Sequence, residues 1–283
     1  MLLTGGGGEL YPLYEGKMIH QFNASFKEAQ YFLDPKAFDE RLRSKEIYRL
    51  KQDLGLDNKE YKELLKSIYP KMRKEVAEDS FIKYDRKFIR LGYRKIASDT
   101  NERTLIFSLL PKMVGCGENM WQHIPKKYIL ENKQIAYQKI SHLRICFALG
   151  IFNALIVDFI ARGMIQINVS KTYLERIPLP QPSDSEILEN ATFKQIAHNA
   201  LALQCYNDKE GHFKDLQEEF KIPQKEIPTT PKAYDTLRAK LDITIARDVY
   251  KLEKEEFFYL LESFKVLNSK QPHTIALLKS LWE

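Results

Sequence analysis

The sequence predicts an α+β fold: small mixed sheets that carry a helical insertion, followed by an all-helical C-terminal segment. Three observations support this class. Apolar and polar residues alternate near the start of the chain, a long charged stretch with helical spacing follows, and the last third is rich in helix-capping signals. With 283 residues, 44% of them hydrophobic, the chain has the composition of a folded protein with a sizeable core.

The first elements are expected to be a tether, a strand and an insertion. Glycines 5–8 place residues 1–9 in a flexible tether, and the alternation over Tyr14–Phe22 favours a strand that includes Glu15, Gly16 and Lys17. From Pro35 to Ser80 the apolar residues form only a thin stripe among charges. This pattern predicts a helical insertion at about 35–80 between strands.

The middle of the chain is expected to contain two further strands and a core helix. Lys83–Pro111 predicts a strand, a polar turn at Ser98–Asn101, and a second strand or short helix. The stretch "GCGENMWQHIPKK" that follows has the composition of a loop. Ile140–Ile160 is the strongest helix signal, and its interruption by Asn153 and Asp158 favours a buried helix over a membrane span.

The C-terminal part reads as helical beyond a proline-rich exit. A short strand is expected in "MIQINV", and the prolines of "RIPLPQP" enforce an extended segment. Ser183 and Glu186 form a capping-box pattern for a helix that runs to about Tyr206. A helical pair follows at Tyr234–Tyr250 and Lys254–Phe264, with a last helix after Pro272. We therefore expect an α/β domain at 10–182 and a helical segment at 183–283.

Positive charge is concentrated in one region. Residues 81–140 hold 12 Lys and Arg against 5 Asp and Glu, a net charge of +7, whereas the whole chain carries +6. Such a concentration favours a polyanionic partner, although a solvated lysine-rich surface is the simpler alternative. Three separated cysteines without a CxxC pair indicate neither a disulfide framework nor a zinc site, so a cytoplasmic protein without a membrane partner is expected.

Several enzyme classes lack the residues that they require. No P-loop spacing ends in Lys-Ser or Lys-Thr, and the glycine run has no strand before it, as a dinucleotide site would need. The six histidines show no metal-ligand spacing. Two Glu-x-Lys trios, at Glu15 and at Glu60, resemble the second half of a metal-dependent nuclease site, but such trios arise by chance in charged segments.

Several segments, taken in order, resemble a known family: "LYPLYEGKMIHQFN", "KFIRLGYRKIASDTNERTLIFSLLPK", "FALGIFNALIVDFIARG" with "NVSKTYLERIPLPQP", and "RAKLDITIARDVYKLEKEEFFYLLESFKVL". Together they look like the C-terminal specificity region of type IIG restriction enzymes and related adenine-N6 DNA methyltransferases. The resemblance covers about residues 10–267. It implies a target recognition domain that docks on duplex DNA and reads a short sequence.

The resemblance also defines what other domains would supply. In this family an upstream domain binds S-adenosylmethionine and methylates adenine, and a nuclease domain precedes it. The methyltransferase tetrapeptide, Asn or Asp followed by Pro-Pro and an aromatic residue, is absent from this sequence. Cofactors, namely S-adenosylmethionine and Mg²⁺, are therefore expected only with those other domains, in the same or a companion chain, and the partners are duplex DNA and those domains.

Candidate DNA contacts follow from the chemistry of recognition. Phosphates are contacted by Lys and Arg, guanine by Arg, and adenine by Asn or Gln. The candidates are Lys17, His20, Gln21, Arg86, Arg90, Arg94, Arg103, Lys126, Lys127, Gln166, Asn168 and Lys171. For Arg103, pairing with Glu102 or Asp99 to fix a turn is an equal alternative. Ser170 is expected as an N-cap, and Asn153 and Asp158 as buried hydrogen-bonding groups.

Two other functions remain open at the level of sequence. The helical tail, with its aromatic residues, would serve as a protein-interaction module if deletion beyond about residue 182 abolished function while substitution of Arg90 and Arg94 had little effect. A nuclease would require magnesium-dependent cleavage that depends on Glu60. The concentration of charge favours DNA recognition over both.

Overall fold

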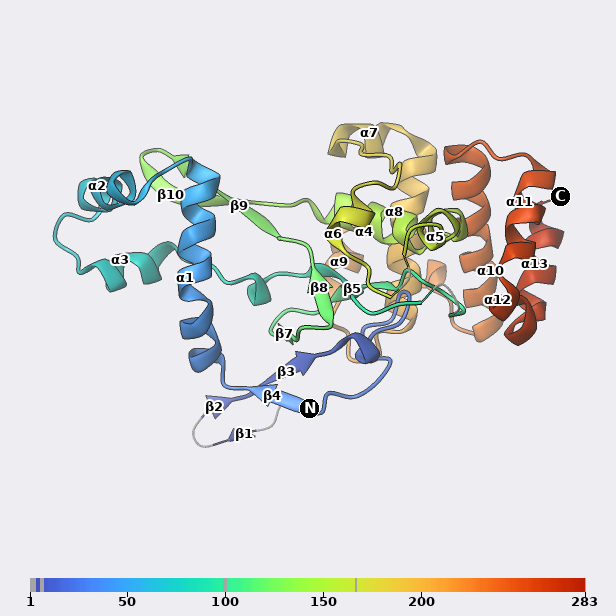
Figure 1. Cartoon of the computed structure of the whole chain (residues 1–283), viewed down its shortest axis with the longest axis horizontal. Helices are drawn as coiled ribbons and strands as arrows, with labels where there is room; N and C mark the ends of the chain where they lie inside the picture. The colour runs from blue at the N-terminus through green and yellow to red at the C-terminus, as the bar shows by residue number, and fades with distance from the viewer. Residues whose placement is uncertain (1–3, 6–7, 99–100, 166, 283) are drawn as a thin grey trace.

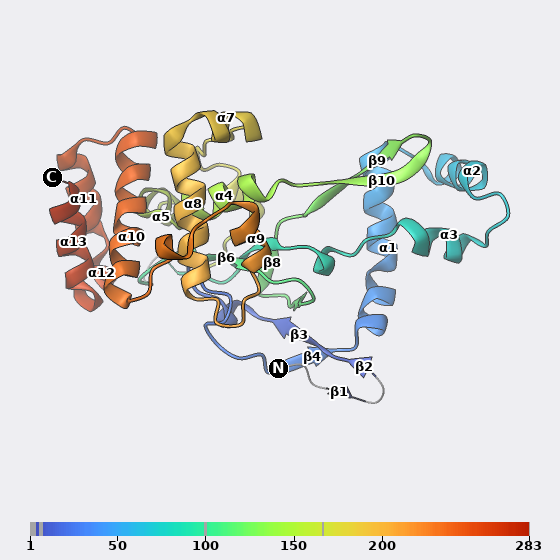
Figure 2. The same cartoon turned by 180° about the vertical axis from the view of Figure 1, so that it is seen from behind.

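A computed structural model describes residues 4–5, 8–98, 101–165 and 167–282 and has the expected α+β fold with a helical C-terminal part. Figure 1 shows a larger lobe, which contains the C-terminal helices, and a smaller lobe at the opposite end of the long axis. The smaller lobe consists of the helices α1 (Pro35–Leu54), α2 (Asn58–Ile68) and α3 (Lys74–Phe81) and of the hairpin formed by β9 (Lys126–Glu131) and β10 (Gln134–Lys139). Figure 2 shows from behind that the hairpin reaches out of the larger lobe and lies across α1.

The strands form two three-stranded sheets and two isolated pairs. In the first sheet, β3 (Tyr11–Tyr14) lies between antiparallel β4 (Tyr31–Leu33) and parallel β7 (Gly115–Cys116). In the second, β5 (Arg90–Arg94) lies between antiparallel β6 (Phe107–Leu110) and β8 (Met120–Gln122). The antiparallel pairs are β1 (Thr4–Gly5) with β2 (Gly8–Glu9), and β9 (Lys126–Glu131) with β10 (Gln134–Lys139).

Two N-terminal predictions are wrong. The segment expected as a tether contains the β1–β2 ladder, in which Thr4 pairs with Glu9. The expected strand over Tyr14–Phe22 ends at Tyr14, and a 3₁₀ helix, η1 (Gly16–Met18), replaces it. A Cβ on Gly16 would lie 2.8 Å from the carbonyl oxygen of Asn119, so the chain approaches a neighbouring backbone closely at this point. Beyond η1, Phe22 adopts a left-handed φ of 56° and is buried.

The helical insertion is confirmed and has clear boundaries. It comprises α1 (Pro35–Leu54), α2 (Asn58–Ile68) and α3 (Lys74–Phe81), followed by the 3₁₀ helix η2 (Asp85–Lys87). The Asp34 side chain caps α1 by accepting the backbone N–H of Ala37 at 2.7 Å, and Gly55 ends the helix with a φ of 66°. An N-cap and a left-handed glycine thus define a helix whose sequence shows only a thin apolar stripe.

The expected core helix over Ile140–Ile160 is two helices. α4 (His142–Asn153) and α5 (Leu155–Arg162) meet at Ala154 with a bend of 62°. The break is stabilised from outside: the N–H of Leu155 donates to Asp242 at 2.7 Å, and Asn153 exchanges hydrogen bonds with the backbone of Phe107. Both helices are largely buried, as predicted. Among the described residues, only this bent pair, and no single helix, is long and apolar enough to cross a membrane.

The C-terminal part is helical, as predicted. Its elements are α6 (Lys171–Leu174), α7 (Asp184–Glu189), α8 (Ala191–Tyr206), α9 (Lys214–Glu219), the 3₁₀ helix η3 (Gln224–Glu226), α10 (Pro231–Ile243), the π-helix η4 (Thr244–Val249), α11 (Lys254–Ser263), α12 (Lys265–Lys270) and α13 (Pro272–Trp282). The Ser183 capping box is present, but its helix ends at Asn190, whose side chain caps α8. The described part of "MIQINV" forms one bridge, between Ile96 and Asn168, and not a strand.

The hydrophobic core does not divide near residue 182. One cluster of buried residues runs from Tyr14 to Leu278, and α4 of the expected first domain packs on α8 of the expected helical segment. A second cluster joins the insertion to the hairpin through residues that include Leu50, Tyr61 and Tyr128. The packing therefore separates the smaller lobe from the rest of the protein and joins the helical tail to the sheets.

Candidate nucleic-acid interface

The structure divides the predicted DNA contacts between the interior and the surface. Five of them are buried, with exposed fractions of 7% or less: Gln21, Arg86, Arg90, Arg103 and Lys126. Each makes hydrogen bonds within the protein. A side chain in this position cannot reach a base or a phosphate, so the expectation of DNA contact is corrected for these five residues.

Arg86 and Arg90 hold the region around β5 together. Arg86 donates two hydrogen bonds to Asp39 of α1, at 2.8 and 2.6 Å, and lies 4.9 Å from the ring centroid of Tyr11. Arg90 donates instead to neutral oxygens, those of Gln122 at 2.6 Å and of the Val114 carbonyl at 2.9 Å. Burial lowers the pKa of Arg90. Arg86 thus fixes the insertion to the start of β5, and Arg90 fixes the loop that carries β7 and β8.

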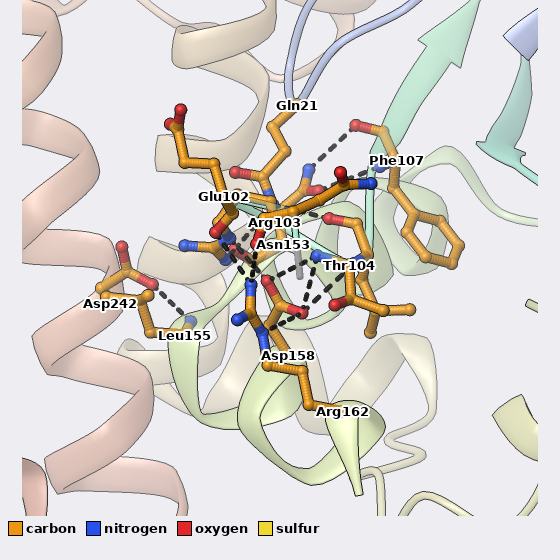
Figure 3. A network of polar contacts seen from close by, with 12 residues as sticks. Gln21, Glu102, Arg103, Thr104, Phe107, Asn153, Leu155, Asp158, Arg162 and Asp242 are labelled. Carbon is orange, nitrogen blue, oxygen red and sulfur yellow. Dashed lines mark hydrogen bonds and ion pairs between the residues drawn. The ribbon is translucent and has the colours of Figure 1, made fainter. Parts of the chain in front are cut away.

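Arg103 is the centre of a buried polar network, which Figure 3 shows. Its Nε lies 2.8 Å from Oδ2 of Asp158, and it also donates to the carbonyl of Asn153. Asp158 accepts the backbone N–H of Thr104 at 3.0 Å, so the pair fixes the start of β6 against α5. Burial lowers the pKa of Arg103. Its partner is the carboxylate of Asp158, which was expected to be buried, and Asp99 lies outside the described residues.

The same network reaches from the N-terminal segment to the helical tail. Gln21 donates through Nε2 to the carbonyl of Leu105 at 2.8 Å, and its Oε1 accepts a hydrogen bond from Arg238 of α10. Asp242, also on α10, accepts the N–H of Leu155. Burial raises the pKa of Asp242, although Arg103 and Arg238 oppose the shift. The predicted buried role of Asn153 and Asp158 is confirmed, and α10 is part of this interior.

Lys126 anchors the hairpin to the insertion. Its ammonium group lies 2.5 Å from Glu46 and 3.1 Å from Asp85, and its side chain is excluded from solvent. The hydroxyl of Tyr128 donates to the same Glu46 at 3.1 Å. Burial alone would raise the pKa of Asp85, but Lys126 and Arg49 outweigh it, and the pKa is lowered. The hairpin therefore has a fixed position on α1.

Three of the remaining candidates lie around the end of β5. Lys17, whose side chain is 46% exposed, lies 2.9 Å from Glu15 and donates to Gln30 at 2.7 Å. Arg94 is partly buried, and its Nε donates to the carbonyl of Ile19 at 3.0 Å. His20 is also partly buried, and burial lowers its pKa to about 4, so the ring is neutral at pH 7. These groups are largely occupied with intramolecular partners.

Two further candidates are exposed: Asn168 in the segment before α6, and Lys171 at the start of α6. Asn168 pairs with Ile96, and the Lys171 side chain is 79% exposed and 3.3 Å from Glu175. Ser170 caps α6 as predicted, by accepting the N–H of Tyr173. Gln166, the last candidate of this group, lies outside the described residues. The sequence pattern thus placed the cap correctly and identified two surface groups.

The hairpin β9–β10 presents Lys127 on an exposed face. Strand residues alternate, so Lys126 and Tyr128 face α1 while Lys127 faces away. Lys127 lies directly opposite Gln138, and Gln134 opposes Glu131 at the tip; all four are exposed. A two-stranded β-ribbon fits the major groove of B-DNA. We call the exposed side chains Lys127, Glu131, Gln134 and Gln138 the ribbon face.

The hairpin turns through two residues with left-handed conformations. Asn132 has a φ of 50° and Lys133 a φ of 60°, and Glu131 and Gln134 flank them as a pair. Positive φ at both central residues is the signature of the type I′ turn, whose twist matches that of the strands. Asn suits this conformation, whereas Lys is strained in it. The side chain of Lys133 is exposed at the tip of the ribbon.

Sequence reasoning missed the ribbon, although a signal for it exists. "KYILE" and "QIAYQ" are rich in β-branched and aromatic residues and are separated by Asn-Lys alone, which is the spacing of a two-residue hairpin. The predicted loop ends at Lys127 and the predicted core helix begins at Ile140, so residues 128–139 carry no predicted element. Gln134 and Gln138 were consequently not among the predicted contacts, and "GCGENMWQHIPKK" contains β7, β8 and the start of β9.

The two nuclease-like trios have structural roles. Glu60 accepts the backbone N–H of Asp57 at 2.8 Å and completes the capping box of α2. Glu15 pairs with Lys17 within the same trio. Within the described part of the chain, no group of three or more His, Cys, Asp or Glu residues is placed to hold a metal ion. Neither Glu60 nor Glu15 therefore has the neighbours of a hydrolytic site.

Comparison of the chain with protein-family models, with curated proteins and with solved structures finds no match.

Proposed function

We propose that the chain is a sequence-specific duplex DNA recognition module, and that the ribbon β9–β10 is its reading element. The ribbon face carries the proposal. It combines a lysine with two glutamines, which are the side chains suited to guanine and to adenine in the major groove. The resemblance in sequence to the specificity region of type IIG restriction enzymes supports the same function and assigns methylation and cleavage to other domains.

The attachment of the ribbon supports a reading role. Base readout needs side chains on a rigid element, because freedom of the backbone would blur the geometry of hydrogen bonding. Lys126, Tyr128 and Glu46 fix one face of the ribbon to α1, so the opposite face is presented without a covering element among the described residues. The buried lysine thus positions its exposed neighbour, Lys127.

Selection of duplexes from a random pool tests the proposal. We expect the chain to enrich a short motif, with an affinity that falls steeply between 50 and 200 mM salt because phosphate contacts release counterions. Gln138→Ala should relax the preference at one position by about 1–3 kcal/mol. Lys194→Ala, an exposed lysine on α8, is the control and should leave the motif unchanged.

The outcomes separate the proposal from its alternatives. If no duplex is enriched and binding shows no dependence on salt, recognition by this chain is excluded. If both Lys127→Ala and Gln138→Ala still enrich the same motif, the ribbon is not the element that reads the bases. The alternative of an interaction module in the helical tail is weakened, because α8 and α10 pack into the main core and carry part of the buried polar network.

A further inference from the structure

The smaller lobe carries a second cationic surface, separate from the ribbon face. Lys59, Lys62 and Lys66 are exposed on α2, at spacings of three and four residues, which places them on one side of the helix. The adjoining side of α2 buries Tyr61 and Leu65. The loop after α2 adds two more exposed cations, Lys71 and Arg73. We call these five residues the α2 basic face.

Three other cations of the smaller lobe form ion pairs. Arg43 pairs with Asp79 and Glu78, Arg49 pairs with Asp85, and Lys74 lies 3.7 Å from Glu78. Among the described residues, no hydrogen bond or ion pair engages the charged group of any member of the α2 basic face, although the backbone N–H of Lys59 donates to the Asp57 cap.

The local carboxylates do not neutralise this charge. Residues 59–73 hold five cations and two carboxylates, a net charge of +3, and the Glu60 carboxylate is occupied with the α2 capping box. Unpaired cations concentrated on one helix face attract a polyanion.

The α2 basic face is joined rigidly to the ribbon. Tyr61 and Leu65 of α2 belong to the same small core as Tyr128 and Ile135 of the hairpin. The hydroxyl of Tyr61 donates to buried Glu78 at 2.9 Å, which fixes α2 on α3. Figure 2 shows α2 next to the far end of the β9–β10 hairpin. The α2 basic face and the ribbon therefore keep a fixed position relative to each other.

We propose that the ribbon and the α2 basic face bind the same duplex. The ribbon reads the bases, and the α2 basic face contacts phosphates outside the base pairs that are read. This inference rests on the proposed function. Lys59 and Lys66 are about 10 Å apart along the helix axis, which corresponds to about three base-pair rises of B-DNA. A membrane surface is the weaker partner, because an interfacial helix exposes a row of large apolar residues beside its cations. α2 turns Tyr61 and Leu65 inward, and Met72 in the loop after it is a single exposed apolar residue beside the basic face.

The salt dependence of duplex binding tests the inference. Each lost phosphate contact reduces the slope of log affinity against log salt by about 0.9. We expect the triple variant Lys59→Gln, Lys62→Gln and Lys66→Gln to bind the same motif with a slope smaller by up to about 2.7, so that the loss of affinity between 50 and 200 mM salt shrinks about 40-fold. Lys232→Gln, Lys265→Gln and Lys270→Gln, all exposed in the tail, form the control with the same change of charge.

Each outcome decides one of the two proposals. If the unaltered chain binds no duplex in a salt-dependent manner, the proposed function fails and this inference fails with it. If the chain binds its motif but the triple variant keeps the slope of the control, only the α2 basic face is excluded. The inference is likewise overturned if the triple variant loses binding to phosphatidylserine vesicles while its slope with duplex DNA stays unchanged.

Discussion

Arg103 and Asp158 form an ion pair in the middle of the larger lobe, with exposed side-chain fractions of 2% and 0% and an Nε to Oδ2 distance of 2.8 Å. The pair joins the start of β6 to α5, which lie more than fifty residues apart in the sequence. Removal of Arg103 would leave the buried Asp158 with Arg162, whose Nε lies 3.6 Å away, as its remaining ion-pair partner among the described residues, and the loss of stability comes mainly from this poorly compensated charge.

We therefore expect Arg103→Ala to lower the free energy of unfolding by about 3–5 kcal/mol. Urea denaturation followed by circular dichroism measures the change. Arg247→Ala is the matched control, because Arg247 is exposed and pairs only with its neighbour Asp248; we expect a change of about 0.5 kcal/mol or less. Equal effects of the two substitutions would contradict a structural role for the buried pair.

Lys126 and Lys127 should respond oppositely to substitution although they are adjacent. Lys126→Met removes the buried partner of Glu46 and Asp85 and leaves them, within the described part of the chain, Arg49 alone as an ion-pair partner, and we expect it to destabilise the hairpin by about 3–5 kcal/mol. Lys127→Gln should change the free energy of unfolding by about 0.5 kcal/mol or less, because its side chain is exposed. Hydrogen exchange of the β9–β10 amides distinguishes the two, and a loss of protection in Lys127→Gln would refute the assigned facing.

The turn of the hairpin can be stabilised. Lys133 has a φ of 60°, which costs a residue with a Cβ about 1–2 kcal/mol, whereas glycine adopts it without strain. We expect Lys133→Gly to raise the free energy of unfolding of the smaller lobe by about 1 kcal/mol, which urea denaturation measures. Asn132→Gly should gain only a few tenths, because Asn tolerates this conformation well. A destabilised Lys133→Gly variant would argue against the type I′ turn.

Stability should fall when the pH drops below 6.5. Burial lowers the pKa of both His20 and His123 to about 4. In the unfolded chain each histidine has its ordinary pKa of 6.5, so between pH 6.5 and 4 the unfolded chain binds protons that the folded chain does not bind. Each histidine then lowers the free energy of unfolding by up to about 1.4 kcal/mol per pH unit between 6.5 and 4, and nothing further is lost below 4 from this source. His20→Gln and His123→Asn should each flatten the profile, and the exposed His273→Gln serves as the control.

The helical tail should be necessary for folding. α4 packs on α8, and Arg238 of α10 bonds to Gln21, so a fragment that ends at residue 182 would expose the apolar surface of α4 and leave polar groups unpaired. We expect this fragment to lack a cooperative thermal transition. If fragment 1–182 folds, the domain boundary predicted near residue 182 is correct, and the helical tail could then act as a separate interaction module.

Helices were predictable wherever local signals define them. Asp34 before Pro35, the pairing of Ser183 with Glu186, and Ser170 before α6 each use a side chain within a few residues of the helix that it caps. The break at Ala154 has no local cause, because the groups that stabilise it come from Asp242 and Phe107, which are distant in the sequence. Composition could not reveal that break.

The candidate site was less predictable than the fold. A basic residue has the same sequence signature whether it faces DNA or a buried carboxylate. Arg86 and Lys126 have partners in α1, 47 and 80 residues away in the sequence. Once the hairpin is known, the alternation of strand residues assigns Lys126 to the buried face and Lys127 to the exposed face. The exposed glutamines of the ribbon were missed because the hairpin itself was missed.

A ribosome releases this chain from its amino end, and the order of release determines which lobe can fold first. The smaller core is complete once Tyr137 has emerged, because all its members precede that residue. The larger core must wait for Ile275 and Leu278 before the first buried residues, such as Tyr14, have all their partners. During synthesis the β9–β10 hairpin can therefore pack early, while the bent helices α4 and α5 keep apolar surface exposed until the tail arrives.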